Sequence, residues 1–273
     1  MTVPGARCVI APPADESVAL TVRDLVVSFG GVAALGGVTF AVAPGTITSL
    51  IGPNGAGKTT AFNAITGYVR PAHGDVRFGA TVLTGSRPCD IAAQGVVRTF
   101  QKTSVFPQLT AFDNVMIGLH LRGAAGLRDV LFRRRRVRQE DAQLASEAEA
   151  LLDFVGLAGQ RDALAGALPY GDQRLLELAI GLAARPKLLL LDEPAAGMTA
   201  SEKAAVTALI QRVRGDGITI LLVEHDMRLV MGISDHVVVL NYGRVIAEGP
   251  PEAMQRHPEV IRAYLGTDSA DAR

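Results

Sequence analysis

The sequence contains no tryptophan and only two cysteines, Cys8 and Cys89, among its 273 residues. The two cysteines are far apart and outside any metal-ligand spacing, which argues against a disulfide framework and a zinc site and suits a reducing cytoplasm. An excess of one charge is missing too, because Lys and Arg total 27 and Asp and Glu total 27. We therefore expect no nucleic-acid partner attracted by bulk positive charge.

Long apolar runs are also missing. The richest stretch, 175–191, is interrupted by charged residues and a proline, so no segment reaches the roughly 18 apolar residues of a membrane span. Residues 1–17 lack the apolar core of a secretory signal, so we expect no export. They are predicted to form a flexible tail, with a short strand at 8–10 as the alternative, and residues 267–273 a second tail.

The remaining composition is that of a globular protein, with 48% hydrophobic and 20% charged residues. Branched and apolar runs bounded by glycine or proline predict strands, and longer periodic segments predict helices. The expected strands are 20–22, 25–27, 38–42, 47–51, 188–191, 218–223 and a hairpin over 237–247, and the expected helices are 58–67, 200–214 and 258–265. Residues 111–157 are mostly helical in pattern. The fold class is therefore α/β with a helical insertion in the middle.

A glycine-rich loop lies between the predicted strand 47–51 and the predicted helix 58–67. It fits G-x-x-x-x-G-K-[ST] and consists of Gly52, Pro53, Asn54, Gly55, Ala56, Gly57, Lys58 and Thr59. Such glycines let backbone N–H groups close around phosphate oxygens, and the helix that follows presents its positive end to the same anion. Lys58 can neutralise the β- and γ-phosphates, and the Thr59 hydroxyl can ligate Mg²⁺. The loop predicts nucleotide binding.

Two carboxylates, Asp192 and Glu193, follow the apolar run 188–191 directly. The carboxyl end of a buried parallel strand is where ligands bind in such sheets. Asp192 is expected to hold Mg²⁺, directly or through water. Glu193 is expected to orient and deprotonate the attacking water, since a carboxylate beside a triphosphate can accept that proton.

One helix in the middle of the chain has a clear apolar face. Its members are Leu144, Ala148, Leu151, Leu152 and Val155. A basic run over 133–136, with Arg138, comes just before it. The run is interpreted as a solvated helix or loop, with contact to anionic lipid or a membrane partner as the alternative.

With these motifs in order, the chain resembles the ATP-binding-cassette (ABC) ATPases over residues 19–266. The resemblance implies a nucleotide-binding domain with a mostly parallel core sheet, an N-terminal antiparallel portion and an inserted helical subdomain. It extends the phosphate loop to Thr60. It also implies that Gln101 contacts Mg²⁺ and the attacking water, and that Phe29 stacks on adenine.

The resemblance identifies a signature segment, followed by a predicted helix that has Leu175, Leu178, Ala179 and Leu182 on one face and ends before Pro186. The segment consists of Leu168, Pro169, Tyr170, Gly171, Asp172 and Gln173. In the family, this helix N-terminus addresses the γ-phosphate held by a second subunit, a task that suits its positive end. Pro169 stands where the family usually has serine and has neither the hydroxyl nor an N–H donor.

Two further segments resemble family motifs after the strands 188–191 and 218–223. His225 matches the switch histidine that hydrogen-bonds the γ-phosphate, and Glu224 is expected to be only its neighbour. Residues 194–198 stand at the D-loop, which crosses the dimer interface in the family, but they lack its usual aspartate.

The resemblance also implies a domain organisation and a mechanism. One domain is expected over 18–266, divided into an ATPase core (18–101 and 187–249), a helical subdomain with the signature (102–186) and a C-terminal helix (250–266). One phosphate loop and one signature cannot meet within one chain, so two copies, or this chain and a paralogue, are expected to complete two ATP sites head to tail. ATP binding then drives dimerisation, and hydrolysis reverses it.

The subfamily signal comes from several segments, among them Arg98–Gln101, Asp192–Gly197 and the ending Pro258–Gly266. They resemble the ATPase subunit of importers for branched-chain amino acids and related urea and amide importers. This implies a cytoplasmic-face location on the membrane, two permease subunits bound through the groove with Phe106, Pro107 and Leu109, and an external solute-binding protein. The alternatives are a lipopolysaccharide-export ATPase, a soluble ABC switch acting on ribosomes or DNA, and a regulatory module that barely hydrolyses ATP.

Overall fold

The structure of the chain is a computed structural model that describes residues 20–99, 105–120 and 134–265. For residues 120, 134–140 and 265 it describes only the backbone. The predicted tails 1–17 and 267–273, Gln101, and the side chains of the basic run 133–136 therefore lie outside the described residues.

A six-stranded sheet forms the centre of the molecule, with strand order β10-β9-β3-β8-β7-β6. Its members are β3 (Ile47–Ile51), β6 (Val96–Arg98), β7 (Leu188–Asp192), β8 (Thr219–Val223), β9 (His236–Asn241) and β10 (Arg244–Gly249). The pairs β3–β8, β3–β9, β7–β8 and β6–β7 are parallel, and β10 pairs with β9 antiparallel. Every residue of β3, β7 and β8 is buried, as expected of strands covered on both faces. The predicted strands and the hairpin are confirmed.

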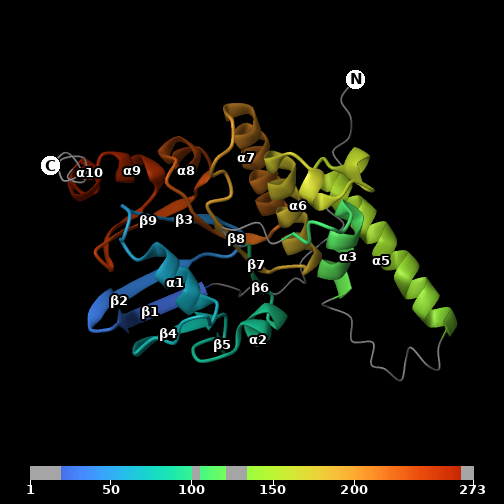
Figure 1. The fold of residues 1–273 in the computed structure, drawn as a ribbon. Helices are drawn as coiled ribbons and strands as arrows, with labels where there is room; N and C mark the ends of the chain where they lie inside the picture. The colour runs from blue at the N-terminus through green and yellow to red at the C-terminus, as the bar shows by residue number, and fades with distance from the viewer. Residues whose placement is uncertain (1–19, 100–104, 121–133, 266–273) are drawn as a thin grey trace.

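A second, four-stranded antiparallel sheet of order β2-β1-β4-β5 lies beside the first (Figure 1). It contains β1 (Leu20–Phe29), β2 (Val32–Val42), β4 (His73–Phe78) and β5 (Thr81–Val82). The two short strands predicted over 20–27 are one strand, because a register shift with Asp24 in the left-handed region (φ 47°) lets β1 continue. The helix α1 (Lys58–Ile65) packs into the apolar core shared with this sheet.

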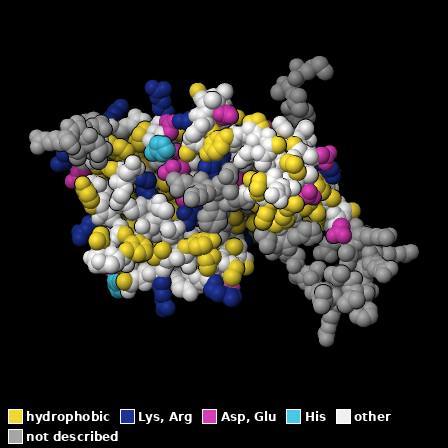
Figure 2. All heavy atoms as spheres, viewed as in Figure 1, with side chains coloured by type: hydrophobic (Ala, Val, Ile, Leu, Met, Phe, Trp, Pro, Cys, Tyr) yellow, Lys and Arg dark blue, Asp and Glu magenta, His cyan; other side chains and the backbone are white. Residues whose placement is uncertain are grey.

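The helical insertion occupies the other side of the central sheet (Figure 1). It contains α3 (Ala111–His120), α5 (Arg134–Phe154) and α6 (Tyr170–Ala183), with 3₁₀ turns at Ala158–Gln160 and Ala165–Ala167. The predicted apolar face of α5 is confirmed, because Ala148, Leu151, Leu152 and Val155 are buried in one cluster and Leu144 packs against it. Figure 2 shows hydrophobic side chains at the surface on this side of the molecule.

The helix α7 (Ala200–Gly215), expected over 200–214, begins with a capping box. The Thr199 hydroxyl accepts the Glu202 backbone N–H, and the Glu202 carboxylate accepts the Thr199 backbone N–H at 2.8 Å. The hydrogen bonds that the Glu202 carboxylate accepts from the backbone N–H and the hydroxyl of Thr199 lower the pKa of Glu202 below its ordinary value of 4.5. The charged carboxylate is therefore the form that holds the start of α7.

The remaining described helices are short. They are α2 (Pro88–Ala93), α8 (Met227–Ile233), α9 (Pro251–Gln255) and α10 (Pro258–Leu265). The C-terminal helix α10 matches the predicted bounds, and its Tyr264 packs against the cluster that contains Ile51. Burial raises the pKa of Tyr264 to about 12, and the Gly52 backbone N–H acts in the opposite direction. The end of the described chain thus reaches the first residue of the glycine-rich loop.

Among the described residues, no helix is long and apolar enough to cross a membrane.

Candidate nucleotide site

The glycine-rich loop joins β3 to α1, as the sequence predicts for a phosphate loop. Gly52 and Gly57 have φ angles of 151° and 104°, in the range that favours glycine. A Cβ on Gly52 would collide with the Leu240 carbonyl oxygen, and a Cβ on Gly57 would lie 2.8 Å from the Ala34 carbonyl oxygen. The backbone of the loop can therefore lie this close to its neighbours only with glycine at both positions.

Lys58 begins α1 and is buried. Its ammonium donates to the carbonyl oxygens of Gly52 at 2.6 Å and Pro53 at 3.0 Å, so it lies folded over the loop. Burial lowers the pKa of Lys58 from its ordinary value of 10.5, while the charges of Glu193 and Asp192 act in the opposite direction. The cation is thus within the electrostatic reach of both predicted carboxylates.

Several other predicted nucleotide contacts are accessible. Asn54, Gly55 and Thr59 are exposed, and Thr60 is half-buried in the first turn of α1. Phe29 ends β1 with 53% of its surface exposed. An exposed aromatic ring at a strand end is available for stacking on a base.

Asp192 ends β7 and is buried, with 3% exposure. Its Oδ2 accepts a hydrogen bond from Arg98 Nη2 at 2.7 Å, and Nη1 of the same guanidinium donates to Asn63 Oδ1 at 2.7 Å. Arg98 therefore ties the end of β6 to β7 and to α1. In the sequence Arg98 is recognisable only as part of a motif. No local pattern indicates that it forms a buried ion pair with a residue 94 positions further along the chain.

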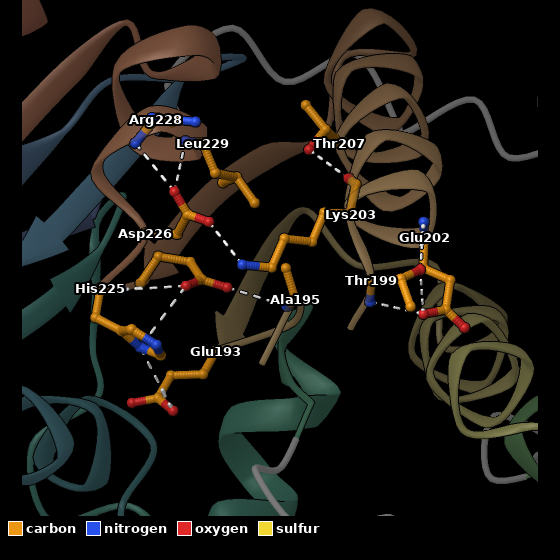
Figure 3. Close-up of polar contacts among 11 residues, drawn as sticks. Glu193, Ala195, Thr199, Glu202, Lys203, Thr207, His225, Asp226, Arg228 and Leu229 are labelled. Carbon is orange, nitrogen blue, oxygen red and sulfur yellow. Dashed lines mark hydrogen bonds and ion pairs between the residues drawn. The ribbon is translucent and has the colours of Figure 1, made fainter. Parts of the chain in front are cut away.

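Glu193 and His225 point toward one another at the carboxyl edge of the sheet (Figure 3). The Oε2 atom of Glu193 lies 3.9 Å from Nδ1 of His225. Glu193 has a left-handed backbone with φ 51°, which is sparsely populated for a residue with a side chain. Its N–H donates to the Val223 carbonyl at 2.9 Å, which fastens the turn after β7 to the end of β8.

Glu224, expected to be only a neighbour of His225, is instead a buried and hydrogen-bonded carboxylate. It is 1% exposed. Its Oε1 accepts the Ala195 N–H at 3.0 Å and its Oε2 accepts the His225 N–H at 3.1 Å. The sequence alone could not indicate this, because Ala195 comes from a different strand end.

The signature residues lie at the start of α6, next to α7 and the segment after β7. Gly171 packs so closely on Glu202 that a Cβ would lie 2.5 Å from its Oε1 atom. Tyr170 lies against Gly197, and its hydroxyl accepts from Arg174 Nε at 3.0 Å. At either end of the segment, Gln173 donates to the Leu168 carbonyl, and Asp172 accepts from Gln160.

Pro169 is the N-cap of α6 and supplies no side-chain hydrogen bond to the first turn. We expect Pro169→Ser to supply one, worth about 1 kcal/mol. The matched control is Pro169→Ala, which removes the same ring but adds no hydroxyl. By thermal unfolding, the serine variant is expected to melt about 2–4 °C above the alanine variant. Equal melting temperatures would show that no cap forms.

Away from this edge of the sheet, a cavity of about 960 Å³ opens between α2, β6, α3 and α6. Its lining includes Tyr68, Cys89, Ala92, Arg98 and Ile180. Beside the helical side, the loop Phe106–Leu109 exposes Phe106 at 52% and Leu109 at 36%, and Leu164 is 50% exposed. The buried Asn114 accepts the Phe106 N–H at 2.7 Å and so holds this loop in place.

In the part of the chain that the structure describes, no group of three or more His, Cys, Asp and Glu residues could hold a metal ion by itself. The donors present, the Thr59 hydroxyl and the Asp192 carboxylate, are oxygen ligands of the kind that Mg²⁺ prefers, and Mg²⁺ commonly takes its remaining ligands from substrate phosphates and water. These residues fit a magnesium–nucleotide complex.

Comparison with known proteins identifies the family. Residues 35–196 match the family described as ABC transporter, and residues 244–270 match the family described as branched-chain amino acid ATP-binding cassette transporter. The chain belongs to the ATP-binding-cassette family of ABC transporters: it is an ATP-binding ATPase subunit of a transporter complex. The resemblance predicted from the motifs is thereby confirmed.

Individual relatives give a more detailed comparison than the family models do. The chain is 42% identical over 248 residues to the high-affinity branched-chain amino acid transport ATP-binding protein BraF of Pseudomonas aeruginosa, covering 90% of this chain and 97% of BraF. The same figures hold for LivG of Escherichia coli K12. Among solved structures, the ADP conformation of MJ1267, an ATP-binding cassette of an ABC transporter, superposes with a TM-score of 0.80 at 31% identity, covering 91% of this chain and 99% of that one. The fold class is confirmed.

Proposed function

We propose that the chain is the ATP-hydrolysing motor of an importer for branched-chain or related hydrophobic amino acids. The observation that carries the hydrolytic part is the pair formed by Glu193 and His225, 3.9 Å apart at the carboxyl edge of the sheet. The solute follows from the names of the relatives, which are branched-chain amino acid transport proteins at 42% identity.

The residue roles follow from the chemistry of the site. Glu193 accepts the proton of the attacking water, and His225 donates to the γ-phosphate. Lys58 exchanges its carbonyl partners for the β- and γ-phosphates, and the N–H groups of the loop from Gly52 to Thr60 hold the phosphate oxygens. Phe29 stacks on adenine. Catalysis is then mostly positioning and charge stabilisation.

Thr59 and Asp192 would hold Mg²⁺, together with Gln101. The metal supplies positive charge that offsets the charge of the transferred phosphoryl group. Arg98 supports this role because its hydrogen bond to one Asp192 oxygen, at 2.7 Å, holds the carboxylate at the end of β7.

We further propose a head-to-tail pair of cassettes, either two copies or this chain with a paralogue. The signature residues 168–173 contact α7 and Gly197 within their own chain, and their helix N-terminus would address the ATP of the second cassette. The pair would bind two permeases at the cytoplasmic face of the membrane, with a solute-binding protein outside. The domain boundaries expected from the sequence belong to this proposal.

The permeases would dock on the cavity between α2 and α6 and on the loop Phe106–Leu109. A cavity of about 960 Å³ can receive side chains of a partner helix. The loop presents exposed apolar side chains, and Asn114 holds its backbone in place. Such a surface is stabilised when a partner covers it.

The alternatives have less support. A lipopolysaccharide-export ATPase shares the core motifs, but the match of residues 244–270 to the branched-chain amino acid family favours the importer. A soluble ABC switch and a weakly hydrolysing regulatory module are disfavoured by the transporter relatives and by the Glu193–His225 pair.

The docking proposal is tested by purification of the tagged chain from detergent-solubilised native membranes. The chain is expected to carry multi-span permeases and a second cassette, identified by mass spectrometry. Ala92→Arg places a charge in the cavity and should abolish recovery of the permeases, while Ala208→Arg on the exposed face of α7 should not.

The transport function is tested separately. Cells lacking the chain should lose uptake of radiolabelled leucine. Recovery of envelope-assembly proteins, or of ribosomal or DNA-repair proteins without membrane proteins, would contradict the importer.

A further inference from the structure

Glu224 lies where the ends of two neighbouring strands meet. It follows β8, whereas Ala195 follows β7, and these strands pair in parallel up to Asp192 and Val223. Each oxygen of the Glu224 carboxylate accepts a different backbone N–H, that of Ala195 at 3.0 Å and that of His225 at 3.1 Å. One side chain therefore joins the two turns that present Glu193 and His225.

The burial of this carboxylate makes the contacts energetically important. A side chain that is 1% exposed gains almost nothing from water, so its charge must be stabilised by hydrogen bonds. Hydrogen bonds to an ionised acceptor are stronger than neutral ones. Because both donors are backbone groups, the carboxylate fixes the main chain at two positions and not merely two side-chain rotamers.

Both tied positions are close to the reacting groups. Ala195 is two residues after Glu193, whose left-handed backbone (φ 51°) needs support from its surroundings. The turn is closed by a hydrogen bond from the Ala196 N–H to the Glu193 carbonyl at 3.2 Å. On the other side, the Glu224 Oε2 atom also lies 4.0 Å from His225 Nδ1. Figure 3 shows Ala195, His225 and Glu193 grouped around these contacts.

The charged groups on the neighbouring helices α7 and α8 form other contacts and do not replace the two hydrogen bonds to Glu224. Asp226, the residue after His225, accepts from the Arg228 and Leu229 N–H groups at the start of α8. Its other oxygen accepts from Lys203 of α7 at 2.7 Å. Asp226 and Lys203 thus hold α8 and α7 together, and Glu224 holds the two turns.

We propose that Glu224 is a positioning residue for ATP hydrolysis, which ties the backbone after Glu193 to the backbone of His225 and keeps the two side chains in one relative position. This inference rests on the proposed function of Glu193 and His225. The inference deepens that proposal, because the relative position of the Glu193 and His225 side chains then depends on Glu224, a residue with no proposed contact to the nucleotide.

The test is Glu224→Gln, which keeps the shape but places an NH₂ donor against one of the two N–H donors. We expect kcat for ATP hydrolysis to fall about 10- to 100-fold, the loss of one hydrogen bond to a charged group. KM and the dissociation constant for ATP should stay within about twofold, because Lys58 and its loop are not contacted. Equal losses in binding and turnover would overturn a positioning role.

A double-mutant cycle separates positioning from simple destabilisation. In a His225→Ala background, Glu224→Gln should cost less than about threefold, because one of the groups that it positions is gone. Additive losses would overturn the inference. Glu224→Asp keeps the charge but withdraws both oxygens, so an intermediate loss is expected, and full activity of this variant would contradict the proposal even if the Gln variant does not fold.

The matched control is Asp235→Asn. Asp235 also accepts a backbone N–H, that of Ile47 at 2.8 Å, but at the start of β3, the opposite end of that strand from the phosphate loop. The kcat of Asp235→Asn for ATP hydrolysis should stay within about twofold of wild type. If Asp235→Asn lowers kcat as much as Glu224→Gln does, the effect of Glu224→Gln is nonspecific and the inference is overturned. If the wild-type protein itself does not hydrolyse ATP, the proposed function fails; if it does and Glu224→Gln is fully active, only this inference fails.

Discussion

Replacing Glu193 by Gln is expected to lower the rate of ATP hydrolysis at least about 100-fold, the contribution of a general base. Glutamine has nearly the same shape but cannot accept the proton of the attacking water at neutral pH. The neighbouring His225, at 3.9 Å, and the backbone turn at Glu193 should be preserved. ATP affinity should therefore change by less than about twofold. Phosphate release and binding of a fluorescent ATP analogue measure the two quantities.

The control for this substitution is Glu252→Gln, the same chemical change in the first turn of α9. That variant should hydrolyse ATP at the wild-type rate. With hydrolysis blocked, Glu193→Gln should also accumulate as an ATP-bound dimer, which size-exclusion chromatography with ATP and Mg²⁺ would detect. A Glu193→Gln protein that keeps a third or more of the wild-type rate would contradict the assignment of the base.

Replacing Lys58 by Met is expected to weaken ATP binding at least about 30-fold, because it removes a buried cation that should pair with phosphate. Lys58 is held by the carbonyls of Gly52 and Pro53 at 2.6 and 3.0 Å, so its ammonium lies in the loop itself. Methionine fills a similar volume without charge. Isothermal titration with ATP measures the loss directly.

Lys203→Met is the matched control for this second variant. It removes an ion pair of 2.7 Å with Asp226, between α7 and the start of α8, but leaves the phosphate loop untouched. Its ATP affinity should remain within about twofold of wild type. If the two lysine variants lose affinity equally, the effect comes from general charge and not from the phosphate loop.

Much of the central sheet could be predicted from local patterns. The run Leu188–Leu191 has no polar position at all, and a strand buried on both faces is the structure that satisfies it. The glycine-rich loop could also be predicted, because its motif G-x-x-x-x-G-K-[ST] is a continuous segment of the sequence. The capping box of Thr199 and Glu202 is likewise formed by residues close together in the sequence.

Several features that the sequence does not predict depend on contacts between distant segments. The strand His73–Phe78 was not predicted, since its identity depends on pairing with β1. Arg98 and Glu224 look like ordinary members of motifs, and only the fold brings Arg98 to Asp192 and Glu224 to Ala195. Burial of a charged side chain is set by such pairings and has no periodic signature in the chain.

The position of β3 in the sheet has a consequence for synthesis on the ribosome. This strand carries the phosphate loop, yet its two neighbours are β8 and β9, from the last quarter of the chain. At about 5–20 residues per second, β3 waits on the order of 10 to 40 s for its partners to be made. Until then the glycine-rich loop has no sheet behind it. A nascent or truncated chain that ends before β8 therefore presents no formed ATP site, and nucleotide binding reports that translation is nearly complete.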